Sequence, residues 1–361
     1  MSGGPPLIVS YSGVFGGAER VLLDCATRLD RSAIVACPDG SLAAAVRAAG
    51  VGWAPVRERP LRRGAAHARG LAGLAWESAT LARRHRPQAI VAWGARAVLA
   101  TALLPARPPL LAVHHDLLPR PRRGSATGDA GRAVGDRRIA SAVRWATRRS
   151  DGVAAASAAI AADVGAPGAV ILHPGVDLAA WAPAPLPPPD PPRALVLGAL
   201  VPWKRPDLAL DVAALVPGLQ LELAGAPLPG DGEAFARSLR ARAQGLDGQV
   251  TFAGRLDDPR PALARAHCLL HCADAEPWGL ALVEALAAGR PVVAVDAAGP
   301  REIVRDGAGR LFAPGDAAAA AAALRDVLAD ASAPAAARAR AEHFPVEASA
   351  ARFAAALAEI T

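Results

Sequence analysis

Two glutamates frame the segment of this chain with the clearest chemical potential, EPWGLALVEALAAGRPVVAVDAAGPRE at residues 276–302. Glu276 precedes a turn at Pro277 and Gly279, and Glu284 lies in the apolar helix that we expect after this turn. The N-terminus of a helix offers unpaired backbone N–H groups and a positive dipole end, which favour an anion such as phosphate. The two carboxylates repel phosphate but accept hydrogen bonds from hydroxyl groups. A phosphate flanked by hydroxyls indicates a nucleotide sugar.

A single lysine is the second chemical signal. Of the 40 basic residues of the chain, only Lys204 is a lysine, and the others are arginines. It lies in ALVLGALVPWKRPDLAL, residues 194–210, which we interpret as a strand, a loop and a helix. A lone lysine in an arginine-rich chain indicates a position that needs a compact ammonium group, where a planar guanidinium does not fit.

These segments resemble the signature of the retaining family-4 glycosyltransferases. In that signature two glutamates are separated by seven residues, with aromatic-Gly after the first and Gly-x-Pro-Val after the second. The resemblance implies an α/β protein of the GT-B fold, with two Rossmann-like domains facing across a cleft and a C-terminal helix crossing back to the first domain. We place an acceptor-side domain at residues 1–188, a nucleotide-sugar-binding domain at 189–344 and the returning helix at 345–361.

The resemblance also implies roles for residues of the second domain. Glu276 would meet the hydroxyls of the transferred sugar and Glu284 the ribose, while the amides of the Gly279–Leu280 turn hold the diphosphate. Trp278 replaces the more usual phenylalanine. The remaining donor-binding residues that we expect are Gly198, Gly254, Arg255 and Leu256.

Lys204 matches the lysine that contacts the donor diphosphate in the family. The arginine that accompanies it there is missing, because Ala199 occupies its position. Either Lys204 and helix N-termini carry the charge of the leaving group, or Arg205 or another arginine reaches in. Weakened activity is the third alternative.

The first domain contributes two candidate segments. Gly16 and Gly17 join the first strand to the first helix, and the family carries a Gly-Gly-x-Glu segment at this place that faces the donor phosphate. In LLAVHHDLLPR a histidine ends a buried strand, where open α/β sheets place their ligands. The sequence leaves open whether His114 or His115 lines the donor, since strand alternation points them to opposite sides.

The resemblance therefore implies retaining transfer of a hexose, mannose or glucose, from a UDP- or GDP-sugar to a sugar, lipid or small-molecule acceptor. The expected catalytic residues are His114, His115, Lys204 and Glu276, with no metal and no cofactor besides the donor. Two alternatives stay open. One is a catalytically degenerate GT-B protein that binds a nucleotide sugar, which Ala199 favours. The other is a sugar-nucleotide epimerase of related fold.

Charge is unevenly divided along the chain, whose formal net charge is +7. Residues 1–188 carry 23 arginines against 12 acidic residues, whereas the remainder has an acidic excess. This half should seek an anionic partner, and we expect peripheral contact with an anionic membrane rather than with nucleic acid. The basic clusters are Arg57, Arg59, Arg62 and Arg63; Arg83, Arg84 and Arg86; and Arg120, Arg122 and Arg123. Four cysteines without disulfide spacing, and no secretory signal, predict a cytoplasmic protein.

Apolar strands alternate with helical stretches, the pattern of doubly wound parallel sheets. We predict six strands in each half, the last of them, GRLFAPGD, hairpin-like, and a stiff Pro-rich linker at residues 182–192. A helix at 317–329, a loop and a helix at 346–360 should end the chain. The histidines and cysteines of HCLLHC, residues 267–272, are interpreted as core packing because their spacing is that of a strand.

Overall fold

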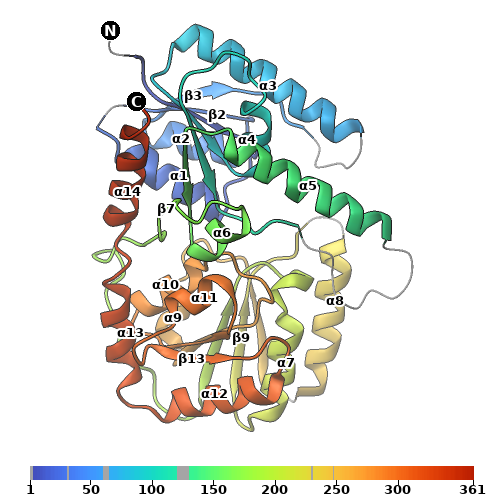
Figure 1. Cartoon of the computed structure of the whole chain (residues 1–361). Helices are drawn as coiled ribbons and strands as arrows, with labels where there is room; N and C mark the ends of the chain where they lie inside the picture. The colour runs from blue at the N-terminus through green and yellow to red at the C-terminus, as the bar shows by residue number, and fades with distance from the viewer. Residues whose placement is uncertain (1–2, 31, 60–64, 120–129, 229–230, 247) are drawn as a thin grey trace. The chain divides into compact units, whose positions relative to one another are not determined.

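Short apolar strands alternate with helices along the whole chain, and in the computed structural model they form two separate parallel sheets (Figure 1). The structure describes residues 3–30, 32–59, 65–119, 130–228, 231–246 and 248–361. The chain divides into two compact units, one formed by Met1–Pro174 with Glu347–Thr361 and the other by Gly175–Val346. The two Rossmann-like units confirm the predicted GT-B fold class.

The first unit contains a seven-stranded sheet in the order β3-β2-β1-β4-β5-β6-β7. Every pair is parallel, and β1 lies inside the sheet with Leu7 paired to Ile34 on one side and to Ile90 on the other. The central strands are buried on both faces, which explains their near-continuous apolar sequences. The strands are β1 (Leu7–Ser10), β2 (Ile34–Cys37), β3 (Gly52–Pro55), β4 (Ile90–Trp93), β5 (Leu110–His114), β6 (Gly152–Ala155) and β7 (Val170–Ile171).

Helices cover the sheet of the first unit. The chain-terminal α14 belongs to this unit, where the ring of Phe353 lies edge-on to that of Trp93, with centroids 6.1 Å apart. α4 contacts both α3 and α5, so these three helices form one layer. The helices are α1 (Gly17–Thr27), α2 (Ser41–Ala48), α3 (Ala65–His85), α4 (Ala95–Thr101), α5 (Ala130–Arg148), α6 (Ala158–Asp163) and α14 (Val346–Ala358).

The second unit contains a six-stranded parallel sheet in the order β10-β9-β8-β11-β12-β13. The strands are β8 (Arg193–Leu197), β9 (Gln220–Ala224), β10 (Val250–Gly254), β11 (Cys268–His271), β12 (Val292–Val295) and β13 (Gly309–Phe312). The helices are η1 (Pro202–Lys204), α7 (Pro206–Leu215), α8 (Asp231–Ala243), η2 (Gln244–Leu246), α9 (Arg260–Arg265), α10 (Leu280–Ala287), α11 (Ala298–Ile303), α12 (Ala317–Ala329) and α13 (Ala333–Ala341).

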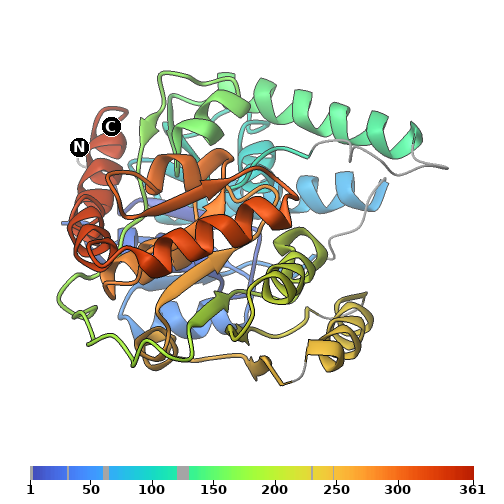
Figure 2. The ribbon, with the colours of Figure 1, turned by 90° about the horizontal axis from the view of Figure 1, so that it is seen from below.

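One face of this second sheet packs against α7, α8 and α12. The core on this face includes Cys268 and Leu270 of β11 and Cys272 directly after it, together with apolar side chains from all three helices. α12 contacts β12, β13 and α7, and Figure 2 shows it lying across this part of the unit. Burial of this apolar surface supplies the main driving force for folding of the unit.

The Pro-rich run at residues 182–192 is not a free linker. Arg338 donates from Nη1 to the carbonyl oxygen of Trp181 at 2.7 Å, and the buried Arg290 donates from Nη2 to that of Pro185 at 2.8 Å. Both arginines belong to the second unit. The structural division accordingly falls after Pro174, earlier than residue 188, because guanidinium groups anchor the run to the second unit.

Three local predictions were wrong. β3 was not anticipated, because GWAP is too short and too rich in turn formers to read as a strand. β13 is not part of a hairpin but pairs with β12 in parallel, with Val292 opposite Gly309. The expected loop after residue 329 contains α13, which buries small alanine faces against α10.

Candidate functional site

Neighbouring strands of the second unit bring the predicted donor residues together. β8 and β11 pair directly, so their carboxyl ends meet at the same edge of the sheet. The chain leaving β8 enters η1, which ends at Lys204, and the chain leaving β11 reaches Glu276. Open α/β sheets bind their ligands at this edge.

Three side chains converge at this edge. Lys204 Nζ forms an ion pair with Oε2 of Glu276, and His271 Nε2 lies 3.0 Å from the same oxygen. The Lys204 ammonium also lies 4.4 Å from the centroid of the Trp203 ring, a cation–π contact. His271 and Glu276 are buried, whereas the side chain of Lys204 is 21% exposed. The lysine is therefore the member of the cluster that solvent reaches most easily.

The carboxyl group of Glu276 is held ionised. Burial alone would raise its pKa, but the hydrogen bond to His271, the charges of Lys204 and His271, and the hydrogen bond to Lys204 lower the pKa to about 2. An ionised, immobilised carboxylate is suited to accept hydrogen bonds from hydroxyl groups.

The helix after Glu276 begins as predicted, at a glycine. Gly279 is the N-cap of α10 with φ of 112°, a left-handed conformation that disfavours other residues. A Cβ atom there would lie 2.8 Å from Cδ1 of Leu282. The first N–H groups of α10, from Leu280 onward, have no intrahelical acceptor and make this terminus suitable for an anion.

Glu284 and Trp278 have different positions around this turn. Glu284 is buried on α10. Trp278 is also buried, and its ring lies edge-on to that of Phe344, with centroids 5.4 Å apart. The Gly299 amide donates to the carbonyl oxygen of Glu276 at 3.1 Å, and a Cβ at Gly299 would overlap the Trp278 backbone. Trp278 therefore packs the turn against Phe344 and Gly299.

Arg205 forms ion pairs with acidic side chains of the second unit. Its guanidinium pairs with Asp207 through Nη2 at 3.0 Å and with Asp274 through Nη1 at 3.2 Å. Ala199 lines a small cavity of about 10 Å³ together with Gly198, Lys204 and His271. Arg205 is not among the residues that line this cavity.

The second group of expected donor residues lies farther along the same edge. Gly254, with φ of 73°, ends β10, and Arg255 and Leu256 follow it. β10 is an edge strand, separated from β8 by β9. The structure places these residues at the carboxyl edge without bringing them into the cluster around Glu276.

In the first unit, the paired glycines start α1. Gly16 is the N-cap, and its backbone N–H donates to Oε2 of Glu19 at 3.2 Å, so the Glu19 side chain reaches back to the start of the helix. Burial raises the pKa of Glu19, and the charge of His115 opposes this rise. The Gly-Gly segment and His115 are therefore electrostatically coupled at one end of the sheet.

The two histidines of the first unit have distinct environments. His114 is buried, with Nε2 lying 3.0 Å from the hydroxyl of Thr147, and burial lowers its pKa to about 4. His115 Nδ1 lies 3.1 Å from Asp116, and its Nε2 lies close to Gly94. Burial lowers the pKa of His115, but the hydrogen bond to Asp116 and the charges of Asp116 and Glu19 raise it above its ordinary value. The charge of Glu19, which follows the Gly-Gly pair, is among the causes of the raised pKa of His115, whereas burial dominates the pKa of His114.

The HCLLHC segment contains a site residue that the sequence analysis missed. Cys268 and Cys272 are buried in the core, as the core-packing interpretation requires, and burial raises the pKa of each thiol. His271 points to the opposite face and contacts Glu276, so core packing does not describe it fully. Strand alternation was the available signal, since it separates His271 from the cysteines. Among the described residues, no group of three or more His, Cys, Asp or Glu is arranged to hold a metal ion.

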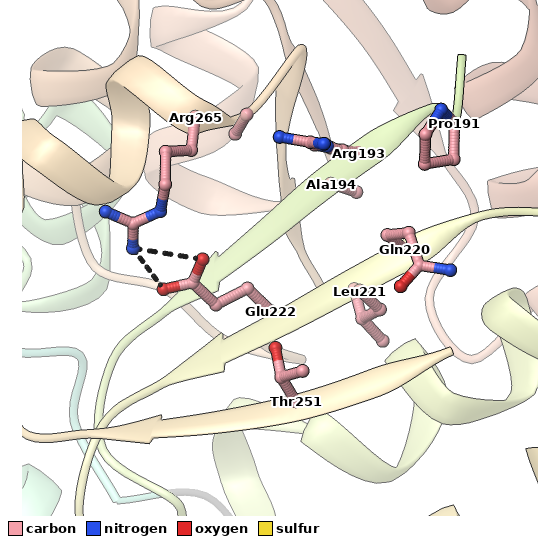
Figure 3. Close-up of a pocket in the computed structure, with 9 residues that line it drawn as sticks. Pro191, Arg193, Ala194, Gln220, Leu221, Glu222, Thr251 and Arg265 are labelled. Atoms are coloured by element: carbon pink, nitrogen blue, oxygen red, sulfur yellow. Dashed lines mark hydrogen bonds and ion pairs between the residues drawn. The ribbon is translucent and has the colours of Figure 1, made fainter. Parts of the chain in front are cut away.

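A groove of about 260 Å³ lies at the other end of the second sheet (Figure 3). Arg193 and Gln220, the first residues of β8 and β9, line it, and Arg265 crosses it to pair with Glu222 at 2.9 Å. Its remaining lining residues are Pro191, Ala194, Leu221, Thr251 and Ala266. Because it lies at the amino ends of the strands, the groove is separate from the Lys204–Glu276 cluster.

Comparison with protein families decides the identity of the chain. Residues 179–344 match the profile described as Glycosyl transferases group 1, and residues 15–180 match the profile described as Glycosyltransferase Family 4. The chain belongs to the family-4 glycosyltransferases. The two matches meet near residue 180 and between them contain every site residue discussed above.

Family-4 relatives with curated names cover parts of the chain. It is 34% identical over 145 residues to the lipopolysaccharide core biosynthesis glycosyltransferase LpsE of Rhizobium meliloti, a match covering 40% of this chain and 41% of LpsE. It is 36% identical over 168 residues to the phosphatidyl-myo-inositol mannosyltransferase of Mycolicibacterium smegmatis, covering 45% of this chain and 43% of that protein. The chain thus matches about two-fifths of the length of these relatives.

Solved glycosyltransferase structures resemble the whole chain. HepE of Anabaena, crystallised with UDP and glucose, superposes with a TM-score of 0.82 at 25% identity, covering 98% of this chain and 99% of HepE. Sucrose-phosphate synthase of Thermosynechococcus elongatus superposes with a TM-score of 0.80 at 20% identity, covering 97% of each chain. At 20% identity, the similarity to sucrose-phosphate synthase shows a shared fold only.

Proposed function

We propose that this family-4 glycosyltransferase moves a hexosyl group from a nucleoside-diphosphate sugar to an acceptor with retention at the anomeric carbon. The observation that carries the proposal is the cluster of Lys204, His271 and Glu276 beside the N-terminus of α10. In one small region it combines a fixed carboxylate for sugar hydroxyls with an ammonium group and free helix amides for phosphate.

Each group has a proposed role in this reaction. The α10 amides at Gly279–Leu280 bind the diphosphate, Glu284 binds the ribose, and Glu276 orients the sugar. Lys204 neutralises the charge that develops on the departing diphosphate, an electrostatic contribution of the kind that dominates such transfers. In the first unit we propose His115, rather than the core histidine His114, as the ligand-contacting histidine.

UDP-glucose is the first donor to test, because HepE, at 25% identity, has been crystallised with UDP-glucose. GDP-mannose is the second, since a mannosyltransferase is among the relatives. The proposed reaction uses neither a metal nor a cofactor besides the donor. The acceptor is proposed only by class, as a sugar, a lipid or a small molecule.

A nucleotide-sugar-binding protein without transfer activity is the second candidate. It is favoured by Ala199, which removes a cation from the diphosphate region, and by the engagement of Arg205 with Asp207 and Asp274. This candidate binds the donor as tightly as an enzyme would but releases no nucleotide.

Two measurements on the full chain test the proposal. Thermal unfolding with UDP, GDP or ADP should show a rise in midpoint for one nucleotide, because a ligand that binds only the native state stabilises it. Nucleotide release from the matching sugar donor should then depend on an added acceptor. Glu284→Ala serves as the control that should lose the thermal shift. Stabilisation without release identifies the binding protein, and no stabilisation by any of the three overturns both candidates.

A further inference from the structure

The outer face of α3 carries a tryptophan between arginines. Trp76 is 70% exposed. Arg69 lies seven residues before it, and Arg83 seven residues after it, so that all three fall on one side of the helix, with Arg84 beside them. The exposed positions in the described part of this face contain no acidic residue, since Glu77, the only acid of the helix, is half-buried.

The outer face of α5 repeats this arrangement. Trp145 is 41% exposed, with Arg138 seven residues before it and Arg148 and Arg149 after it. The guanidinium of Arg149 lies 5.1 Å from the centroid of the Trp145 ring. Asp136, the only acid in α5, is buried, so the described exposed face of this helix is also free of acidic side chains.

These two faces belong to the same layer of the first unit. α4 lies between α3 and α5 and contacts both, and Figure 1 shows the three helices side by side. Their inner sides share one core with the sheet, through Leu74 of α3, Val98 of α4 and Ala146 of α5. Leu103, two residues after the end of α4, is a further exposed apolar side chain of this layer, at 57% exposure.

Of the basic clusters predicted from the sequence, the second contributes Arg83 and Arg84 to this surface, and the other two contribute nothing that the structure describes on it. Arg59 is held by Glu77 through an ion pair of 2.7 Å, and its side chain is only 12% exposed. Five other cluster members lie outside the described residues: Arg62, Arg63, Arg120, Arg122 and Arg123. The described basic groups of this face that the sequence clusters omit are Arg69, Arg138, Arg148 and Arg149.

We propose that the α3–α5 face, defined as Arg69, Trp76, Arg83 and Arg84 of α3 with Arg138, Trp145 and Arg148 of α5 and Arg149 directly after it, binds the surface of an anionic lipid bilayer. Tryptophan rings prefer the interface between headgroups and hydrocarbon, and arginines pair with anionic headgroups while their stems stay apolar. Two exposed tryptophans on two helices of one layer give this face two interfacial anchors for a lipid surface. None of the described helices is long and apolar enough to cross the bilayer, so the contact is peripheral.

Sedimentation of the full chain with vesicles tests this proposal. Vesicles of phosphatidylcholine mixed with anionic phosphatidylglycerol should carry the protein down at low salt. Vesicles of phosphatidylcholine alone should not sediment the protein. About 1 M salt should release the protein from the anionic vesicles, because the Debye length for attraction between charges then falls to roughly 3 Å. The double variant Trp76→Ser, Trp145→Ser should bind about tenfold more weakly.

Matched variants in the second unit test whether vesicle binding depends on the α3–α5 face or only on the total number of exposed apolar and basic side chains. Leu215→Ser with Leu228→Ser removes two exposed apolar side chains of the second unit and should leave sedimentation unchanged. For charge, Arg83→Gln with Arg148→Gln should weaken vesicle binding about tenfold. The control pair is Arg237→Gln with Arg240→Gln, which removes two exposed arginines of α8 and should have no effect.

The outcomes are decisive in both directions. Loss of sedimentation only in the α3–α5 variants, with an unchanged thermal shift on adding nucleotide, supports the proposal. Sedimentation equal to wild type in these variants, or none with the wild-type chain, overturns it. Binding of single-stranded RNA in place of vesicles would also overturn it, and would assign the face to nucleic acid. None of these results depends on transfer activity.

Discussion

His271 Nε2 lies 3.0 Å from Oε2 of Glu276, the same oxygen that contacts the ammonium of Lys204. A histidine at the end of a buried strand and a lysine from a neighbouring loop thus hold one carboxylate oxygen from two sides. The second oxygen of Glu276 is left to accept hydrogen bonds from a ligand. This arrangement makes His271 a positioning residue for Glu276 in the proposed reaction.

Replacing His271 should therefore affect the sugar step more than nucleotide binding. His271→Leu should lower kcat/KM by about tenfold, because Glu276 loses one of the groups that fix it, and UDP affinity should stay the same since UDP lacks the sugar. His271→Gln, which keeps an N–H donor, should recover part of the rate. Steady-state kinetics and calorimetry measure the two effects. An equal loss in UDP affinity would show that His271 only supports the fold.

Lys204→Arg should impair turnover although it keeps the charge. The ammonium fits between the Trp203 ring and Glu276, and a planar guanidinium is larger and directs its hydrogen bonds differently. We expect kcat/KM to fall by about tenfold or more, with Lys204→Met lower still. Donor turnover measures both variants. A wild-type rate for Lys204→Arg would mean that the lone lysine is incidental.

Glu284→Ala should weaken binding of a nucleoside diphosphate more than Glu276→Ala does. Glu284 is the proposed ribose ligand, and losing a charged hydrogen-bond acceptor costs about 2 kcal/mol, or roughly thirtyfold in Kd. Glu276 meets the sugar, which free nucleotide lacks, so its removal should cost little. Calorimetry with UDP compares the two variants. A larger loss for Glu276→Ala would reverse the assignment.

The pKa of His114 predicts a pH dependence of stability in the first unit. Its pKa is about 4 in the folded chain and about 6.5 in the unfolded chain, so the unfolded state binds more protons between these values. Stability should fall as pH drops through this window, by about 2 kcal/mol at pH 5 from this group. In urea unfolding, the free energy of unfolding of His114→Gln should change less between pH 6.5 and 5 than that of the wild-type chain.

His115 provides the contrast, because its pKa is raised. Its contribution is present below its ordinary pKa and is lost as pH rises through the folded pKa, which is the opposite direction. The free energy of unfolding of His115→Gln should therefore fall between pH 6.5 and 5 at least as steeply as that of the wild-type chain. If both histidine variants behave alike, the distinction between the core histidine His114 and the charge-coupled His115 fails.

The sequence was most informative where backbone constraints and chemistry coincide. The Glu276 segment contains a turn glycine, a short apolar helix and a buried strand in fixed order, and each of these leaves a distinct local pattern. For the same reason the fold class followed from the alternation of strands and helices. The joint position of Lys204 and Glu276 was inferred from family resemblance, and the pairing of β8 with β11 explains it.

Local sequence patterns could not predict contacts between residues that are distant in the chain. Arg205 follows Lys204 directly, but Asp207 and Asp274 capture it, and no local pattern announces Asp274. The arginines of Arg57–Arg63 are adjacent in sequence, yet the fold holds Arg59 against Glu77. The choice between His114 and His115 likewise depended on Thr147 from α5 and on Glu19 from α1.

Gly279 provides the last test, because its backbone conformation starts the helix that the proposed function requires. With φ of 112°, and a Cβ only 2.8 Å from Leu282 Cδ1, Gly279→Ala should force the turn to shift. Displaced α10 amides would then bind diphosphate more weakly, and we expect a loss of about tenfold in UDP affinity together with about 1 kcal/mol of stability. Gly245→Ala is the matched control in the same unit, since a Cβ there meets no atom within 4 Å. Calorimetry and urea unfolding compare the two alanine variants. Unchanged UDP affinity in Gly279→Ala would remove the N-terminus of α10 from the proposed donor site.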